Sequence, residues 1–385
     1  MNPANPNSPL SDAAAHERQF HDRRMGQADF SRAPFTIAWE ITRACAYACV
    51  HCRANAQHKA DPEELTTAES LRLIDRLAEF GSPILIFTGG DPMMRRDLFE
   101  LIAYATGKGL RCSLTPTATA LPTRERLDQA QQTGIRRIAL SLDAPSPEAH
   151  DNFRQVAGSW ERTMRILNNA YEAGLSAQVN TTVSRYNLEH LPEMVPFIEQ
   201  VGAVQWSVFF LVPTGRAQTL WMISPEEHEQ VFNWLYDLSQ RAPFDIKATA
   251  APMYRRVAIE RRRAEQGSGA SVTFQGAGFQ YADGLNRPTR GVNDGNGFLF
   301  ISHKGDIMPS GFLPIRADNV RQADVVELYR EHPLFKELRD PDKLKGKCRV
   351  CEYRDVCGGQ RGRAYGVTGD YLASDPACAY QPKVL

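Results

Sequence analysis

The stretch FTIAWEITRACAYACVHC, residues 35–52, joins a run of strand-forming residues to three closely spaced cysteines. Its first part, Phe35–Thr42, is rich in β-branched and aromatic residues, which favour a buried strand. Cys45, Cys49 and Cys52 follow with the spacing CxxxCxxC. Thiols clustered in the loop after a strand indicate a metal centre there, at the end where parallel barrels place their active sites.

Strand-like and helix-like segments alternate from residue 35 to about residue 241. Further strands are predicted at Ile84–Thr88, Leu110–Thr115, Arg136–Leu142, Ser176–Val183 and Val204–Leu211. Helical periodicity predicts helices at Thr67–Phe80, Asp97–Lys108, Thr123–Thr133, Trp160–Ala173 and Glu189–Val201, and a last helix containing Val231, Trp234, Leu235 and Leu238. Several of these helices are followed by a glycine as a stop signal: Gly81, Gly109, Gly134, Gly174 and Gly202.

Six consecutive strand–helix units predict an α/β fold with a parallel sheet, because parallel neighbours require helical crossovers. We expect a partial (β/α)6 barrel of the TIM type. Eight units would close such a barrel, whereas six leave it open on one side, which suits a large substrate. A doubly wound sheet is the alternative arrangement of the same units.

The barrel is expected to occupy residues 35–242, after a flexible tail at residues 1–34. Residues 243–297 are predicted to be a bridging segment that ends in the Gly-rich stretch GVNDGNG. Residues 298–385 form a C-terminal extension. Its predicted elements are a hairpin, Phe298–Ser302 with Asp306–Pro309, and short helices near Asp324–Glu331 and His332–Arg339.

The overall composition argues against several classes of partner. Lys plus Arg and Asp plus Glu both number 45, so the formal net charge is zero, and neither nucleic acid nor an anionic membrane is an expected partner. The sequence has no apolar run of the roughly 20 residues that span a membrane, and Met1–Phe30 lacks the apolar core of a secretory signal. We therefore expect a cytoplasmic protein, whose clustered thiols bind metal and do not form disulfides.

The first cysteine group can hold a cluster with an open site. Three thiolates can bind three irons of a cubane and leave the fourth iron free for an external chelating ligand. The alternative is a zinc site completed by His51 or His58, although zinc sites favour CxxC pairs and four protein ligands.

The spacing and position of Cys45, Cys49 and Cys52 resemble the signature of the radical SAM superfamily. The resemblance covers residues 35–242 and implies that these thiols bind a catalytic [4Fe-4S] cluster, whose open iron is chelated by S-adenosylmethionine. Reductive cleavage would then give a 5′-deoxyadenosyl radical that abstracts hydrogen from a substrate. The positions that match the family's cofactor contacts are Gly89, Gly90 and Asp91 in TGGDP, Ser141 and Asp143 in LSLDAP, Arg154, and Asn180.

The second cysteine group contains Cys348, Cys351, Cys357 and Cys378. Four thiols can saturate either a structural zinc or a [4Fe-4S] cluster, and spacing alone does not separate the two. The segment resembles the SPASM/twitch region of radical SAM enzymes, especially those of the alternative haem pathway and of the haem of denitrification. The matching pattern is CGG-x-RxRAY-xxTGD-xxxxDPxC, residues 357–378.

This second resemblance implies a single auxiliary [4Fe-4S] cluster, because four thiols suffice for one. Gln360 and Ser310 stand where some relatives carry further cysteines. Cys112 is predicted to be a buried apolar residue. The arginine-rich run Arg255, Arg256, Arg261, Arg262 and Arg263 is either a solvated helix face or a site for porphyrin carboxylates.

The expected function is therefore radical chemistry on a large substrate, with flavodoxin or ferredoxin as electron donor. A haem precursor is the first candidate substrate. Maturation of a ribosomally made peptide is the alternative within the same class. A non-enzymatic zinc module is the alternative from another class, and it predicts a colourless protein that does not cleave S-adenosylmethionine.

Overall fold

The computed structural model describes residues 29–266 and 291–383, which share a single mixed sheet of ten strands in the order β10-β9-β8-β1-β2-β3-β4-β5-β6-β7. The strands from β8 through β1 to β7 are parallel, and β9 and β10 are antiparallel additions at one edge. The strand bounds are β1 Thr36–Thr42, β2 Ile84–Gly89, β3 Arg111–Leu114, β4 Arg137–Ser141, β5 Ser176–Val183, β6 Gln205–Phe210, β7 Asp245–Thr249, β8 Phe298–Ile301, β9 Asp306–Met308 and β10 Asp318–Asn319.

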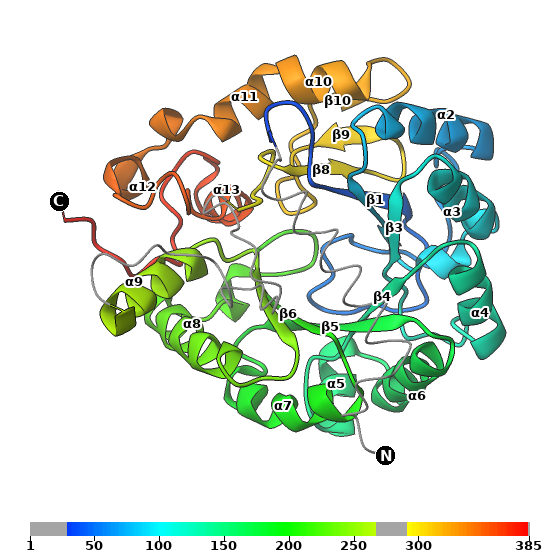
Figure 1. Ribbon diagram of the computed structural model, residues 1–385, viewed down its shortest axis with the longest axis horizontal. Helices are drawn as coiled ribbons and strands as arrows, with labels where there is room; N and C mark the ends of the chain where they lie inside the picture. Colours follow the sequence, from blue (N-terminus) through cyan, green and yellow to red (C-terminus); the bar gives the residue numbers. More distant parts are fainter. Residues whose placement is uncertain (1–28, 267–290, 384–385) are drawn as a thin grey trace.

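The sheet curls into an open barrel, with the helices of the crossovers on its outside (Figure 1). This arrangement confirms the predicted partial barrel and excludes the doubly wound alternative, which has helices on both faces of the sheet. The glycines predicted to end helices all have positive φ, between 62° and 105°. The crossover helices are α2 Thr67–Ala78, α3 Leu98–Gly107, α4 Arg124–Gln132, α5 Pro147–Arg154, α6 Ser159–Glu172, α7 Leu191–Gln200, α8 Pro225–Ser239 and α9 Tyr254–Gln266.

The structure extends the barrel beyond the six predicted strands. Residues 243–266, predicted as a bridging segment, contain β7 and α9. Strand β8 pairs in parallel with β1 and forms the predicted hairpin with β9, so the start of the C-terminal extension belongs to the barrel sheet. The predicted boundaries at residues 242 and 298 therefore do not coincide with the ends of the sheet. Residues 267–290 of the predicted bridging segment lie outside the described residues.

The C-terminal helices follow one side of the barrel, from α10 beside α2, past the β8–β9 hairpin, to α12 and α13 on the side of α9 (Figure 1). They are α10 Val325–Glu331, α11 Pro333–Arg339, α12 Gly346–Val350 and α13 Arg361–Thr368. In α13, Arg363 donates hydrogen bonds to the carbonyls of Phe210 and Leu211 at the end of β6, and to Ala250 after β7. The segment with the second cysteine group is thereby fixed to the carboxyl ends of barrel strands.

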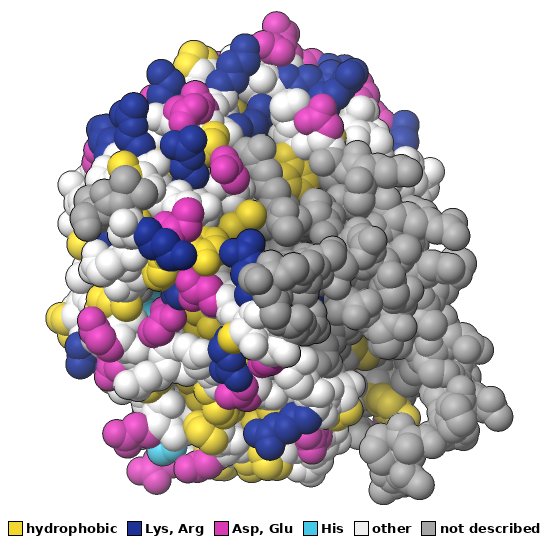
Figure 2. All heavy atoms as spheres, turned by 60° about the vertical axis from the view of Figure 1, so that its left-hand side comes forward, with side chains coloured by type: hydrophobic (Ala, Val, Ile, Leu, Met, Phe, Trp, Pro, Cys, Tyr) yellow, Lys and Arg dark blue, Asp and Glu magenta, His cyan; other side chains and the backbone are white. Residues whose placement is uncertain are grey.

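The described surface fits the neutral composition. On the face shown in Figure 2, acidic and basic side chains are interspersed, and neither sign forms a continuous field. Among the described helices, none combines the length and apolarity that a membrane span needs.

Candidate active site

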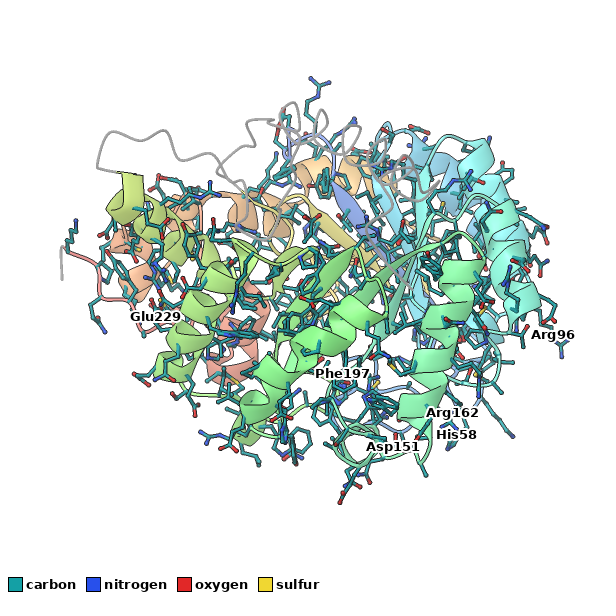
Figure 3. The ribbon with its side chains drawn as sticks, turned by 60° about the horizontal axis from the view of Figure 1, so that its bottom comes forward. His58, Arg96, Asp151, Arg162, Phe197 and Glu229 are labelled. Atoms are coloured by element: carbon teal, nitrogen blue, oxygen red, sulfur yellow. The ribbon has the colours of Figure 1, made fainter. Side chains whose placement is uncertain are left out.

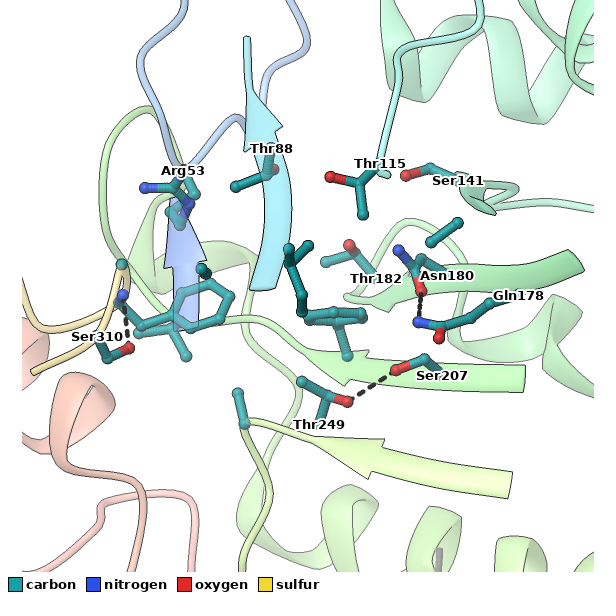
Figure 4. Close-up of a pocket in the computed structure, with 18 of the residues that line it drawn as sticks. Arg53, Thr88, Thr115, Ser141, Gln178, Asn180, Thr182, Ser207, Thr249 and Ser310 are labelled. Atoms are coloured by element: carbon teal, nitrogen blue, oxygen red, sulfur yellow. Dashed lines mark hydrogen bonds between the residues drawn. The ribbon is translucent and has the colours of Figure 1, made fainter. Parts of the chain in front are cut away.

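A cavity of about 540 Å³ runs through the barrel along the strands. Its wall is made by the inward-facing, alternate residues of each strand, so that both the first and the last residues of the strands contribute. Small polar side chains from or just after β2 to β5 project into the cavity (Figure 4): Thr88, Thr115, Ser141, Asn180 and Thr182. These groups can donate hydrogen bonds to a polar cofactor and accept hydrogen bonds from it.

The three thiols of the first cysteine group line this cavity. Cys45 and Cys49 are buried with Tyr47 in one small cluster, against which Cys52 packs. The backbone N–H of Tyr47 donates to the Cys45 sulfur at 3.3 Å, and the Thr117 hydroxyl lies 3.6 Å from the same sulfur. Burial raises the pKa of both the Cys45 and Cys49 thiols, so thiolates are favoured here only beside a positive charge such as a metal.

The geometry of the thiols suits a cluster better than a single ion. Within residues 29–266 and 291–383, no three Cys, His, Asp or Glu side chains converge on one point as ligands of one metal ion. A zinc site requires such convergence, whereas each thiolate of a cubane binds a different iron. The three thiols around one pocket, with a hydrogen bond to sulfur, therefore fit an iron–sulfur cluster.

Neither histidine of the zinc alternative completes a site with the thiols. His51 lines the cavity, but its ring stacks on Phe153 at 4.1 Å between centroids. Burial, with Arg154 nearby, lowers the pKa of His51 to about 3, so the ring is neutral. His58 is exposed at the periphery of the molecule (Figure 3).

Gly89 and Gly90 hold the second strand tightly against the cysteine loop. A Cβ at Gly89 would lie 2.4 Å from the Thr42 carbonyl oxygen, and one at Gly90 would lie 2.4 Å from that of Ala44. The N–H of Gly90 donates to Thr42 at 2.9 Å, and that of Asp91 donates to Ala44 at 2.7 Å. Both glycines line the cavity, so the close approach forms its rim beside the thiols.

Asp91 and Asp143, both predicted to contact the cofactor, do not line the cavity. Asp91 is fully buried and accepts hydrogen bonds from the Thr119 hydroxyl and the N–H groups of Met93 and Thr117, so it organises the rim from behind. Burial outweighs these bonds and raises the pKa of Asp91.

Asp143 acts on the cavity through Arg154. Its carboxylate pairs with the Arg154 guanidinium at 2.6 and 2.7 Å and accepts from the Thr182 N–H at 2.8 Å. Burial alone would raise the pKa of Asp143, but the Arg154 charge and this hydrogen bond hold it below its ordinary value. Arg154 lines the cavity and reaches the Cys49 sulfur at 3.9 Å, so a fixed cation lies beside the first cysteine group.

Ser141 and Asn180, the other predicted contacts, do line the cavity and pair in register on the neighbouring strands β4 and β5. Sequence reasoning missed two supports of the thiols. Thr117 bridges Cys45 and the Gly90 carbonyl, which its hydroxyl reaches at 2.9 Å. Arg216 donates to the carbonyls of Cys49 and Ala56 at 2.9 Å each, and the PTGRA motif of residues 213–217 was the signal for it.

The second cysteine group forms its own pocket. All four thiols line it, together with Gly358, Gly359 and Lys347. Three sulfurs have hydrogen-bond donors: Tyr353 N–H to Cys351 at 3.5 Å, Gly359 N–H to Cys357 at 3.4 Å, and Arg361 to Cys348 at 3.9 Å. Four thiols around one pocket, with donors to their sulfurs, suit a saturated cluster.

The two pockets are adjacent. Asn293 lines the barrel cavity and donates to the carbonyls of Cys357 at 3.3 Å and Gly359 at 2.9 Å. Gln360 and Ser310, which replace cysteines of other SPASM proteins, face the barrel cavity and not the second pocket. A substrate in the cavity would thus lie between the two cysteine groups.

The arginine-rich run, predicted to be either a solvated helix face or a site for porphyrin carboxylates, faces both the cavity and the acidic residues around it. Arg255 lines the cavity, whereas Arg256 pairs with Glu229 and Glu260, and Arg261 pairs with Asp237. Cys112 is buried, as predicted, and burial raises its thiol pKa to about 12.

The fold and the first cysteine group define a radical SAM enzyme, and residues 39–198 match the Radical SAM superfamily. An AdoMet-dependent heme synthase of Oleidesulfovibrio alaskensis is 44% identical to this chain over 92% of it and 89% of the relative. The chain belongs to the radical SAM superfamily. It is therefore an enzyme whose family uses S-adenosylmethionine and a [4Fe-4S] cluster.

More distant comparisons agree. An AdoMet-dependent heme synthase of Methanosarcina barkeri is 40% identical over 91% of this chain and 98% of its own. Among solved structures, SuiB of Streptococcus suis, bound to its precursor peptide SuiA, matches with a TM-score of 0.68. That match covers 98% of this chain and 82% of SuiB at 16% identity, so it supports the shared fold alone.

Proposed function

We propose that this enzyme makes haem from a porphyrin precursor by converting propionate arms to vinyl groups. The observation that carries the proposal is the identity of 44% with an AdoMet-dependent heme synthase over nearly the whole chain. The cavity supports it, because it is large, opens on the thiols of the first cysteine group and adjoins the second.

The chemistry requires two oxidising events per arm. A propionate carboxylate that becomes a vinyl group loses one hydrogen atom, one carbon dioxide and one further electron. The bound cofactors would supply a 5′-deoxyadenosyl radical that removes the hydrogen atom. An external donor such as flavodoxin or ferredoxin would supply the electron that forms this radical. The protein's own part is to position the arm, to exclude water and to provide an exit for the electron.

In this proposal the residues of the cavity rim hold S-adenosylmethionine. Arg154, fixed by Asp143, pairs with its carboxylate, and the Gly89–Gly90 rim receives its ammonium group. Ser141 and Asn180 contact its ribose or its carboxylate. Cys348, Cys351, Cys357 and Cys378 would hold one auxiliary [4Fe-4S] cluster, which would supply a one-electron acceptor, and Asn293 joins their pocket to the cavity wall.

The test is a turnover assay with iron coproporphyrin III, a porphyrin with four propionates. Anaerobically reconstituted enzyme, S-adenosylmethionine and a reductant should give products that lack one carbon dioxide and two hydrogens for each converted arm. One 5′-deoxyadenosine should form per arm. A porphyrin returned unchanged, while a candidate peptide raises 5′-deoxyadenosine above background, would replace the proposal with peptide maturation.

Removing two thiols of the second cysteine group should distinguish the contributions of the two clusters. With Cys351→Ala and Cys378→Ala together, bound iron should fall from about eight to about four per chain, since each cubane holds four. Cleavage of S-adenosylmethionine should persist, while vinyl formation falls because the substrate electron has no acceptor. Iron, zinc and sulfide counts check this. If the second group binds zinc, the wild type will contain about four irons and one zinc.

Asp143→Asn should weaken S-adenosylmethionine binding through Arg154. The amide keeps the shape of the side chain but cannot neutralise the guanidinium, so Arg154 loses its charge-assisted partner. We expect the Kd for S-adenosylmethionine to rise about tenfold, with the iron content unchanged, because one such bond contributes roughly 1.5–3 kcal/mol.

Equilibrium dialysis measures this change, and Asp128→Asn is the matched control. Asp128 pairs with Arg124 on an exposed helix face, with both side chains about two-fifths exposed. Equal affinities of the two variants would contradict the role given to Asp143.

A further inference from the structure

Two large apolar side chains are exposed on adjoining segments of the surface. Tyr186, just after β5, is 53% exposed, and Leu220, in the short 3-10 helix η3 (Thr219–Trp221), is 65% exposed. The Tyr186 ring contacts the Trp221 ring at 5.6 Å between centroids, and the backbone N–H of Arg185 donates to the Trp221 carbonyl. We call Tyr186, Leu220 and Trp221 the aromatic patch. Exposed apolar side chains that gather in this way are typical of a contact surface.

A row of ring contacts connects the aromatic patch with the cysteine loop. The Phe153 ring lies 5.6 Å from that of Tyr186 and 4.1 Å from that of His51, between centroids. His51 belongs to the loop that carries the first three thiols. Neither Phe153 nor the patch is among the described residues that line the barrel cavity. The patch therefore adjoins the first cysteine group from outside the cavity, on a surface that a substrate in the cavity does not occupy.

The segments around the patch carry positive charge, although the whole chain is neutral. Residues 41–60, 176–188 and 200–225 contain no Asp or Glu, and their Lys and Arg residues are Arg43, Arg53, Lys59, Arg185 and Arg216. Arg43 and Arg53 pair with Glu40. Arg185 and Arg216 donate to the carbonyls of Met222 and Cys49, and no carboxylate of the described residues pairs with either one. Two cations beside the patch are thus available to an acidic partner.

Reductive cleavage of S-adenosylmethionine requires an electron from outside the protein. We propose that the aromatic patch, flanked by Arg185 and Arg216, is the docking surface of a one-electron donor protein with an acidic face. The donor would be oxidised by one electron, which would pass to the iron–sulfur centre of the first cysteine group, and no proton would move with it. This inference rests on the proposed function only through the need for an external electron.

The size and charge of the surface suit a transient partner. Electron-transfer encounters bury little surface, less than about 1,200 Å² in total, so a few anchoring side chains can suffice. Aromatic residues at the centre of an interface contribute much of its affinity. Opposite charges around them mainly accelerate association and select the partner. A donor bound in this way can leave after each electron, while the porphyrin stays in the cavity.

Flavodoxin is the probe, and its binding and its electron delivery are measured separately. The double variant Tyr186→Ser with Leu220→Ser should raise the Kd for oxidised flavodoxin about tenfold or more, because two anchors are lost. Calorimetric titration gives the Kd. With flavodoxin below its Kd, formation of 5′-deoxyadenosine should fall by about the same factor. With dithionite as reductant it should equal that of the wild type, because a small reductant needs no docking surface.

Tyr171→Ser is the matched control, since Tyr171 on α6 is also 53% exposed but does not belong to the patch. Its flavodoxin Kd should equal that of the wild type. Arg185→Glu tests the charge separately: it should weaken flavodoxin binding and make the affinity less dependent on salt.

Equal flavodoxin Kd values in the wild type, the double variant and Arg185→Glu overturn the docking surface, and so does a wild type that does not bind flavodoxin. A double variant that loses a dimer in light scattering, with an unchanged flavodoxin Kd, assigns the patch to a second copy of this chain and also overturns the proposal. Failure of the proposed function has a different signature. In that case porphyrin is returned unchanged even with dithionite, while the flavodoxin Kd values still differ.

Discussion

Replacing Cys45, Cys49 and Cys52 together by alanine is expected to abolish 5′-deoxyadenosine formation and to leave about four irons per chain. The three thiols line one cavity and belong to the same loop, and the rim that we assign to S-adenosylmethionine is built against that loop. Without them no iron with an open coordination site remains, so the loss should be complete and not partial. Iron counts and chromatography of the reaction mixture measure the two effects.

Cys112→Ala is the control for the removal of a thiol. Cys112 is also buried and also lines the cavity, but it lies on β3, away from the cysteine loop. It should keep about eight irons and full cleavage of S-adenosylmethionine. If the triple variant still forms 5′-deoxyadenosine, the assignment of the first cysteine group is wrong.

Much of the fold could be predicted because the strands of the barrel carry buried apolar residues and are separated by regular helices. Gly81, Gly109 and Gly134 marked helix ends that the structure confirms by their positive φ. Strand β7 was missed because its sequence, DIKAT, places a lysine on the cavity side and so breaks the apolar pattern.

The candidate site was predictable where a motif lies at a strand end, and less so where a side chain acts through another. The cysteine spacings and the two glycines led directly to the cavity rim. Asp143 and Asp91 were predicted as contacts, but neither lines the cavity. Asp143 pairs with Arg154, and Asp91 accepts a hydrogen bond from the backbone of Thr117. Their motifs identified the right loops, whereas only the three-dimensional arrangement shows which side chain faces the cavity.

Arg363→Leu is expected to cost the folded protein about 3–5 kcal/mol, because it leaves a buried charge without its partner. Arg363 and Asp375 are both fully buried and lie 3.1 Å apart, and the same guanidinium donates to the carbonyls of Phe210, Leu211 and Ala250. Four acceptors on three segments lose their donor at once. Urea unfolding, followed by tryptophan fluorescence and by iron release, measures the loss.

The effect should be uneven along the chain, because Arg363 joins the second cysteine group to the barrel. We expect the auxiliary irons to be released at lower urea than those of the first cluster. Lys345→Met, which breaks an exposed pair with Asp370, should change stability little. Replacing Arg363 and Asp375 together by leucine should recover part of the loss, since no buried charge is then left unpaired. Equal stabilities of Arg363→Leu and Lys345→Met would mean that the two parts are held together by packing and not by this ion pair.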